Sequence, residues 1–133
     1  MKYLLDTNVC VTFLNRRNPL LEQRYNAVPS SDKIICSIVR AELLYGGFKS
    51  QRRPASVLFM ESYLANEPNL DFDLTAARIF GELRADLERK GTPIGAYDLQ
   101  IAAIALAHGL TLVTHNTREF SRVPNLLLED WEI

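Results

Sequence analysis

Short apolar runs alternate with longer segments of helical periodicity along the whole chain. Strands are predicted over residues 2–5, 33–36, 70–72, 110–113 and 126–128. Helices bounded by capping residues, proline or glycine are predicted over residues 7–15, 19–28, 38–49, 54–65, 74–90 and 98–107. This alternation predicts an α/β fold in which a parallel sheet of about four to five strands lies between two layers of helices and is joined by right-handed crossovers.

The length and composition favour one folded domain spanning residues 1–133. A hydrophobic fraction of 47% and a charged fraction of 23% are ordinary for a globular chain, and no linker-like stretch divides it. The N-terminal apolar run ends at Asp6, too early for a secretory signal, and no later run is long enough to span a membrane. We therefore expect a cytoplasmic protein, in which Cys10 and Cys36 are small buried side chains rather than disulfide or zinc partners.

The overall charge provides little attraction to nucleic acid. The chain carries 15 Lys and Arg against 16 Asp and Glu, a net charge of −1, so any binding of a polyanion must be local. Two basic clusters are candidates for phosphate contacts: Arg16 with Arg17, and Lys49 with Arg52 and Arg53. Solvated loops are the alternative for both clusters.

Three acids occupy positions where side chains around a parallel sheet converge on a ligand. Asp6 directly follows the first strand, at the edge of the sheet where loops from separate strands meet. Glu42 lies one turn into the helix after the second strand, and its uncharged helical neighbours favour a partly buried position. Asp98 begins an almost wholly apolar helix, whose dipole favours an ionised carboxylate. The alternatives are helix capping for Asp6 and Asp98, and a surface position for Glu42.

Asn116 and Glu119 are candidates for a fourth oxygen ligand. Asn116 follows the strand predicted to end at residue 113, and Glu119 lies one turn further on. The residues by themselves leave both open, since Glu119 can instead pair with Arg118 or Arg122 on the surface. His115, next to Asn116, is a candidate for contact with a substrate.

Convergent carboxylates repel one another unless a cation neutralises them, so this pattern is itself a hypothesis for a metal site. Oxygen ligands without thiolates suit Mg²⁺ or Mn²⁺. Such ions contact substrate phosphates and activate water for attack on phosphorus. The reaction class predicted from these residues is therefore hydrolysis of a phosphodiester.

Four motifs follow one another along the chain. They are Asp6-Thr7-Asn8, Ser-Ile-Val-Arg-Ala-Glu42-Leu-Leu-Tyr-Gly, Gly91-Thr-Pro-Ile-Gly-Ala-Tyr-Asp98-Leu-Gln-Ile-Ala-Ala, and Leu-Val-Thr-His-Asn116-Thr-Arg-Glu-Phe. In this order they resemble the motifs of the PIN-domain nucleases, and more narrowly those of VapC toxins. The resemblance covers essentially the whole chain.

The resemblance implies a three-layer α/β/α fold and an endoribonuclease that uses Mg²⁺ or Mn²⁺ to cleave structured RNA, frequently transfer RNA near the anticodon. Asp6, Glu42 and Asp98 fall on the three core acids of the family, which implies that they are catalytic and hold the metal. Many members have a fourth acid where this chain has Asn116. The substrate-binding residues expected on this basis are Thr7, Asn8, Asn116, Arg16 and Arg17.

The resemblance also implies protein partners. A VapB-type antitoxin would fill the groove and block the acids, the toxin would form a homodimer, and operator DNA would be reached only through the antitoxin. The helix predicted over residues 54–65 carries more apolar side chains than one buried stripe needs. An interface would cover the excess, and deep burial in the monomer is the alternative.

Two other functions stay open at this point. A phosphatase-like domain would use Asp6 as its nucleophile, although Asn8 replaces the second acid that one large phosphatase class has two residues after that Asp. A catalytically silent module would keep the fold and bind only RNA or an antitoxin. The presence of all three acids argues against the silent module.

Overall fold

The computed structural model describes residues 2–133 and contains a sheet of four short parallel strands at its centre. The strands are β1 (Tyr3–Leu5), β2 (Lys33–Ile34), β3 (Thr111–Val113) and β4 (Leu127–Glu129). Their order in the sheet is β2-β1-β3-β4, and Leu4 of β1 lies opposite Ile34 on one side and Leu112 on the other. The parallel sheet predicted from the sequence is confirmed, with four strands.

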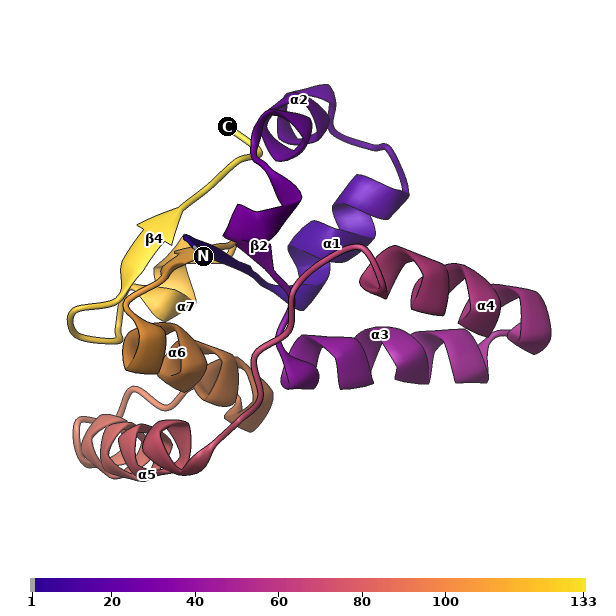
Figure 1. Ribbon diagram of the computed structural model, residues 1–133. Helices are drawn as coiled ribbons and strands as arrows, with labels where there is room; N and C mark the ends of the chain where they lie inside the picture. The colour runs from indigo at the N-terminus through magenta and orange to yellow at the C-terminus, as the bar shows by residue number, and fades with distance from the viewer. Residues whose placement is uncertain (1) are drawn as a thin grey trace.

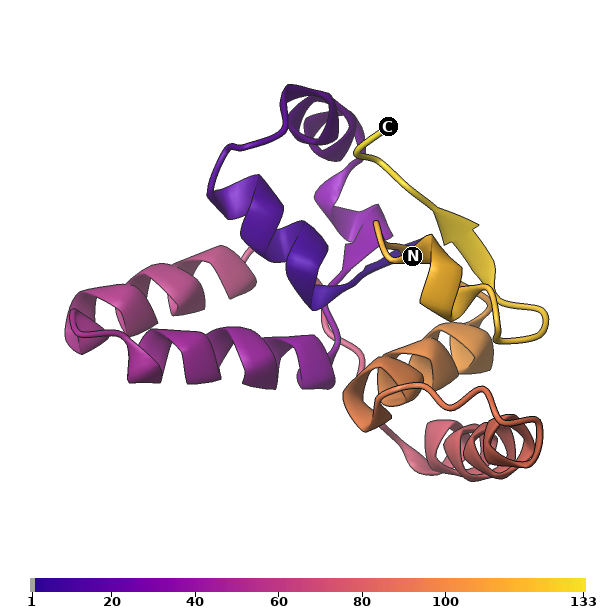
Figure 2. The same cartoon turned by 180° about the vertical axis from the view of Figure 1, so that it is seen from behind.

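Helices cover both sides of this sheet, as Figures 1 and 2 show. They are α1 (Thr7–Leu14), α2 (Pro19–Ala27), α3 (Ser37–Lys49), α4 (Arg53–Leu64), α5 (Leu74–Arg89), α6 (Ala96–His108) and the short α7 (Thr117–Phe120), with a 3-10 turn η1 (Ser30–Asp32) before β2. In the view of Figure 1, α2 lies above the sheet, α1 lies to its right, and α5 and α6 lie below it. The α3–α4 pair projects sideways from the molecule as a helical hairpin.

The strand predicted over residues 70–72 does not form. The N–H of Ser37 donates to the carbonyl of Leu70 at 2.9 Å, so this segment does run beside the end of β2. The N–H of Phe72, however, donates to the Ser37 hydroxyl at 3.2 Å instead of to a backbone carbonyl. Because a side chain takes the place of the next ladder partner, the segment stays outside the sheet.

Helix α6 is buried on nearly every side, as its apolar sequence predicts. Its buried residues are Leu99, Ile101, Ala102, Ala103, Ile104 and Ala105. The small alanine side chains let α6 contact α5 on one side and β3 on the other. The middle of α6 is therefore held in the core, and its first turn, which carries Asp98, lies at the edge of that core.

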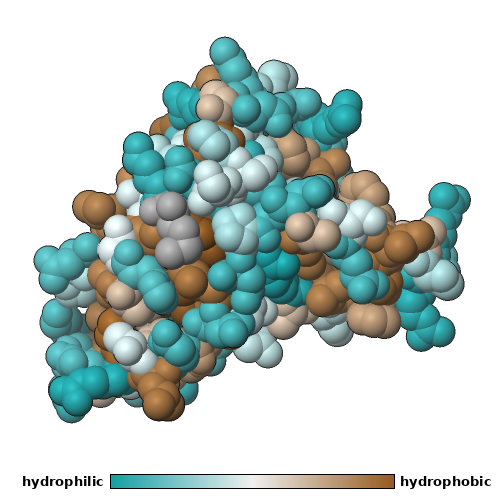
Figure 3. All heavy atoms as spheres, viewed as in Figure 1, coloured by the Kyte–Doolittle hydropathy of each residue, from teal (hydrophilic) through white to brown (hydrophobic). Residues whose placement is uncertain are grey.

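The α3–α4 hairpin is closely packed inside and apolar outside. A Cβ atom on Gly47 would lie 3.4 Å from the Cα of Val57, which shows how closely the two helices approach. Leu64 at the end of α4 is 4% exposed, whereas Leu58 and Phe59 are 67% and 55% exposed. Figure 3 shows hydrophobic side chains gathered over this hairpin. The apolar excess of α4 is thus only partly absorbed by the monomer.

No helix within residues 2–133 combines the length and the hydropathy that crossing a membrane requires.

Replacing two glycines by alanine is expected to change the free energy of unfolding in opposite directions. Gly109 ends α6 with φ of 62°. Gly81 lies inside α5, and a Cβ added there would meet no atom within 4 Å. Gly109→Ala is expected to lower the free energy of unfolding by about 1 kcal/mol, because alanine is strained at positive φ. Gly81→Ala is expected to raise it by about 0.5–1 kcal/mol, since alanine favours a helix. Urea denaturation of both variants measures the two changes, and equal signs would contradict the assigned helix ends.

Candidate active site

Asp6 is held between the ends of the two central strands. It follows β1 and caps α1, with Oδ1 accepting a hydrogen bond from the N–H of Val9 at 2.8 Å. Its Oδ2 accepts a hydrogen bond from the hydroxyl of Thr114, the fully buried residue after β3, at 2.5 Å. Asp6 itself is 5% exposed. Helix capping therefore accounts for one oxygen of Asp6, and the other is tied to the neighbouring strand.

The surroundings of Asp6 disfavour its ionised form. Burial, and to a lesser extent the nearby charges of Asp98 and Glu132, raise the pKa of Asp6 to about 6. The hydrogen bonds from Thr114 and Val9 act in the opposite direction. A carboxyl group with such a pKa takes up or releases a proton close to neutral pH.

Glu42 is half-buried and linked to the first motif. The hydroxyl of Thr7 donates to Glu42 Oε1 at 2.8 Å, which joins the first turn of α1 to the second turn of α3. The partly buried position expected from its uncharged helical neighbours is what the structure shows. Thr7, predicted as a substrate contact, thus also positions the Glu42 carboxylate.

Asp98 and Glu119 bring two further carboxylates to the same edge. Asp98 is half-buried in the first turn of α6, where burial raises its pKa and the charges of Glu119 and Glu42 raise it further. Glu119 in α7 accepts a hydrogen bond from the N–H of Gly95, directly before α6, at 3.4 Å. These mutual effects show that Glu42, Asp98 and Glu119 lie close enough for their charges to repel.

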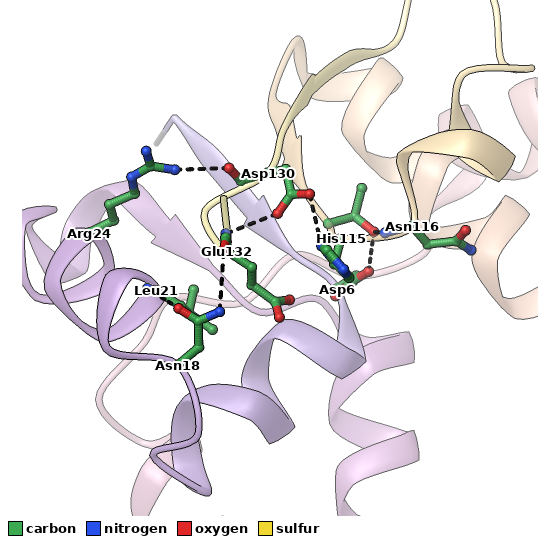
Figure 4. A network of polar contacts seen from close by, with 9 residues as sticks. Asp6, Asn18, Leu21, Arg24, His115, Asn116, Asp130 and Glu132 are labelled. Carbon is green, nitrogen blue, oxygen red and sulfur yellow. Dashed lines mark hydrogen bonds and ion pairs between the residues drawn. The ribbon is translucent and has the colours of Figure 1, made fainter.

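Asn116 lies behind this group of carboxylates. Its side-chain amide donates to Glu119 Oε2 at 2.9 Å, and its N–H donates to the Thr114 hydroxyl at 3.0 Å. Figure 4 shows its side chain pointing away from Asp6. Of the two candidates for a fourth ligand, Glu119 therefore faces the other acids, and Asn116 orients Glu119.

The C-terminal segment adds groups that sequence reasoning did not place at the site. His115 Nδ1 and Asp130 Oδ2 are 2.8 Å apart, and the N–H of Glu132 donates to Asp130 Oδ1 at 2.9 Å. Figure 4 shows His115 and Glu132 beside Asp6. Asp130 raises the pKa of His115 through its hydrogen bond and its charge. The apolar Trp131, which is 4% exposed, was the one signal in the sequence that this segment folds back onto the body.

Two groups of titratable side chains meet near Asp6, and the distances between their possible ligand atoms differ. Within residues 2–133, ligand atoms of His115, Asp130 and Glu132 all lie within 4.8 Å of one another, and Asp6, Glu42 and Asp98 do not form such a group. The two groups meet at Asp6, whose pKa responds to Asp98 from one and to Glu132 from the other.

The remaining predicted substrate contacts are spread along α1. Asn8 is exposed in the first turn of α1, beside the carboxylates. Arg16 and Arg17 are exposed beyond the opposite end of this helix, whose eight residues extend about 12 Å. The two arginines are therefore not brought together with the acids, and any phosphate that they contact lies well away from Asp6.

Comparisons with known proteins agree with this arrangement. The family model described as "PIN domain" matches residues 3–126. The chain is 40% identical over 131 residues to the "tRNA(fMet)-specific endonuclease VapC" of Salmonella typhimurium, and the match covers 98% of each chain. The chain belongs to the VapC branch of the PIN-domain family.

Solved structures of VapC proteins have the same fold. One is similar with a TM-score of 0.92 and 40% identity over 98% of both chains, and comes from the "Crystal structure of DNA bound VapBC from Salmonella typhimurium". A second, with a TM-score of 0.88 and 39% identity, covers 98% of this chain and 99% of the other, and comes from VapBC2 of Rickettsia felis bound to a promoter DNA fragment. The fold and the family predicted from the four motifs are confirmed.

The buried carboxyl group of Asp6 predicts a dependence of stability on pH. Its folded pKa of about 6 exceeds the ordinary value of 3.8, so the folded state binds the proton more tightly than the unfolded state. As the pH rises from about 4 to above 6, ionisation of Asp6 is thus expected to lower the free energy of unfolding of the wild type by about 3 kcal/mol in total. Asn cannot ionise but can still cap α1. Asp6→Asn should therefore be more stable than the wild type above about pH 6, and this advantage should shrink towards about pH 4.

Urea denaturation across this pH range measures the effect. The exposed Asp71 supplies the control, and Asp71→Asn is expected to change stability by less than about 0.5 kcal/mol at any pH. Equal stability of wild type and Asp6→Asn at neutral pH would contradict the cost assigned to the ionised Asp6.

Proposed function

We propose that this VapC-family chain is an endoribonuclease toxin that uses Mg²⁺ or Mn²⁺ to hydrolyse phosphodiester bonds in RNA in the cytoplasm. The observation that carries the proposal is the convergence of four carboxylates from separate elements at one edge of the sheet: Asp6, Glu42, Asp98 and Glu119. Transfer RNA, cut near the anticodon, is the proposed substrate. The name of the Salmonella relative, a tRNA(fMet)-specific endonuclease, supports this choice.

The donor set of this site fits a hard divalent cation. All four side chains offer carboxylate oxygens, the ligands that Mg²⁺ and Mn²⁺ prefer. Burial, together with the charges of Glu119 and Glu42, raises the pKa of Asp98, and a positive charge among these side chains would offset this cost. We assign Asp6, Glu42 and Asp98 as the residues that hold the ion, with Glu119 as the fourth and Asn116 as the residue that positions Glu119. When bound, the ion would supply positive charge for the substrate phosphate and lower the pKa of water.

The protein's own groups then hold and orient the reactants. Thr7 fixes one oxygen of Glu42, and Thr114 with the N–H of Val9 fixes both oxygens of Asp6, so neither acid has to reorganise during the reaction. When His115 is protonated, its Nδ1–H donates to Asp130, and the other ring N–H of the exposed imidazole can donate to a phosphate oxygen of the substrate. Asn8, exposed beside the same edge, can donate to the RNA backbone.

The proposed partners are a VapB-type antitoxin and a second copy of the toxin, with operator DNA contacted only through the antitoxin. The Salmonella and Rickettsia relatives were solved as VapBC assemblies bound to DNA, which supports these partners. The exposed Phe48, Leu58 and Phe59 of the α3–α4 hairpin offer apolar surface for such an interface. The basic residues Lys49 and Arg52 lie at the tip of the same hairpin.

The geometry disfavours a phosphatase that uses Asp6 as its nucleophile. Both Asp6 oxygens already accept hydrogen bonds, and the residue is 5% exposed. A nucleophilic carboxylate must reach phosphorus itself, whereas an ion can bind the second lone pair of an oxygen that already accepts one hydrogen bond. The silent binding module stays as the alternative, and cleavage assays decide it.

The first test is cleavage of total transfer RNA by the purified protein. Wild type with Mg²⁺ or Mn²⁺ is expected to give discrete fragments, and EDTA is expected to abolish them. Asp98→Asn should reduce the rate at least about 100-fold, because one of the groups that holds the ion loses its charge. The exposed Glu82→Gln on α5 is the matched control and should cleave as the wild type does. Full cleavage by Asp98→Asn, or none by the wild type in any metal, would refute the proposal.

A second test separates the roles of Glu119 and Asn116. Binding of Mn²⁺ to the folded state should raise the unfolding temperature of the wild type, because a ligand that binds only the folded protein stabilises it. Glu119→Gln should weaken Mn²⁺ binding by at least about ten-fold, and Asn116→Ala should weaken it less, since Asn116 acts through Glu119. Thermal unfolding over a series of Mn²⁺ concentrations measures both. A larger loss in Asn116→Ala would reverse the assignment.

A further inference from the structure

A cavity of about 460 Å³ opens directly beside the candidate active site. It lies between the first three turns of α3, the first turn of α6 and the start of α1. Its lining consists of Thr7, Ile38, Ala41, Glu42, Tyr45 and Tyr97. Thr7 and Glu42 belong both to this lining and to the carboxylate site. An occupant of the cavity would therefore lie directly beside the proposed metal site.

Two tyrosines from different helices stand at this cavity. Tyr45 of α3 is 64% exposed and Tyr97 of α6 is 63% exposed, although large aromatic side chains are usually packed on both faces. Tyr97 directly precedes Asp98, and Tyr45 lies one turn after Glu42 on the same helix. Exposed rings beside a nuclease site are the platforms on which proteins stack unpaired bases.

The charges around the cavity decide between possible occupants. The lining includes no Lys or Arg, and Ile38, Ala41 and the tyrosine rings make much of the wall apolar, so a phosphate group is disfavoured inside. A nucleobase is neutral and flat, and its exocyclic amino groups are donors that a carboxylate accepts. Lys49 Nζ lies 5.7 Å from the centre of the Tyr45 ring, so a cation is present outside the cavity for the phosphate that follows a stacked base.

We propose that this cavity is a base-binding subsite, in which Tyr45 and Tyr97 stack an unpaired RNA base next to the phosphodiester that is cut. The inference rests on the proposed function and deepens it, since it limits the substrate to RNA with an unstacked nucleotide at the cleavage position, as in a loop. The volume of the cavity, about 460 Å³, is in the range of sites that enclose a small ligand.

The experiment uses an oligoribonucleotide loop that carries a fluorescent purine analogue at the position to be bound, and a matched strand that is abasic there. Binding is measured in EDTA, where cleavage does not interfere. The wild type is expected to change the fluorescence of the purine and to bind the abasic strand more weakly. Tyr45→Ala and Tyr97→Ala should each weaken binding of the purine strand by about ten-fold, and should bind the abasic strand as the wild type does. Phenylalanine at either position should restore binding, because stacking needs only the ring.

Leu74→Ala is the matched control, because Leu74 is an 89% exposed apolar side chain of α5 that does not line the cavity. Its affinity for both strands should equal that of the wild type. Equal affinity of the tyrosine variants and the wild type for the purine strand would refute the subsite even if cleavage of transfer RNA is confirmed. Binding without cleavage would refute the proposed nuclease and leave the subsite standing. Tyrosine variants that lose only antitoxin binding would show that the cavity receives a protein side chain, and would overturn the inference.

Discussion

The hydrogen bond from Thr114 to Asp6 joins the ends of β1 and β3, and the candidate site depends on it. These two strands are paired along their whole length, so the residues that follow them emerge side by side. Asp6 then starts α1, and Thr114 leads through Asn116 into α7. The positions of Asp6 and, through Asn116, of Glu119 thus depend on the register of the central strand pair.

This arrangement places carboxylates at the edge of the sheet where their ionised forms are disfavoured. Asp6 is buried where its ionised form is disfavoured, and Asp98 is surrounded by the like charges of Glu42 and Glu119. Such a cluster lowers the stability of the protein by itself, so the buried apolar layers around β1 and α6 have to supply the difference. A cost of this kind is typical of sites whose charge is meant to be completed by a bound cation.

The surface divides into parts of different character. At the carboxyl edge of the strands, acids, hydroxyl groups and the C-terminal segment with Asp130 and Glu132 form a polar region around Asp6. The α3–α4 hairpin extends away from this region with Leu58 and Phe59 on its outside. Helix α3 connects the two parts, since Glu42 lies near its middle and the exposed Phe48 near its C-terminal end. One helix therefore links the proposed chemistry to the proposed protein interface.

The sequence by itself determined the alternation of strands and helices, the parallel sheet and the family, and it offered Asp6, Glu42 and Asp98 as candidates for the site. Each of these is written in local patterns: apolar runs, capping residues and motifs of a few neighbouring positions. It also allowed a strand over residues 70–72 that does not form, because the choice of a side-chain partner for Phe72 is made across the fold. Only the tertiary structure decided that Glu119 faces Asp98 while Asn116 lies behind it, and that His115 meets Asp130. Those contacts join residues far apart in the chain, or depend on which way a short helix turns, and no local pattern records either.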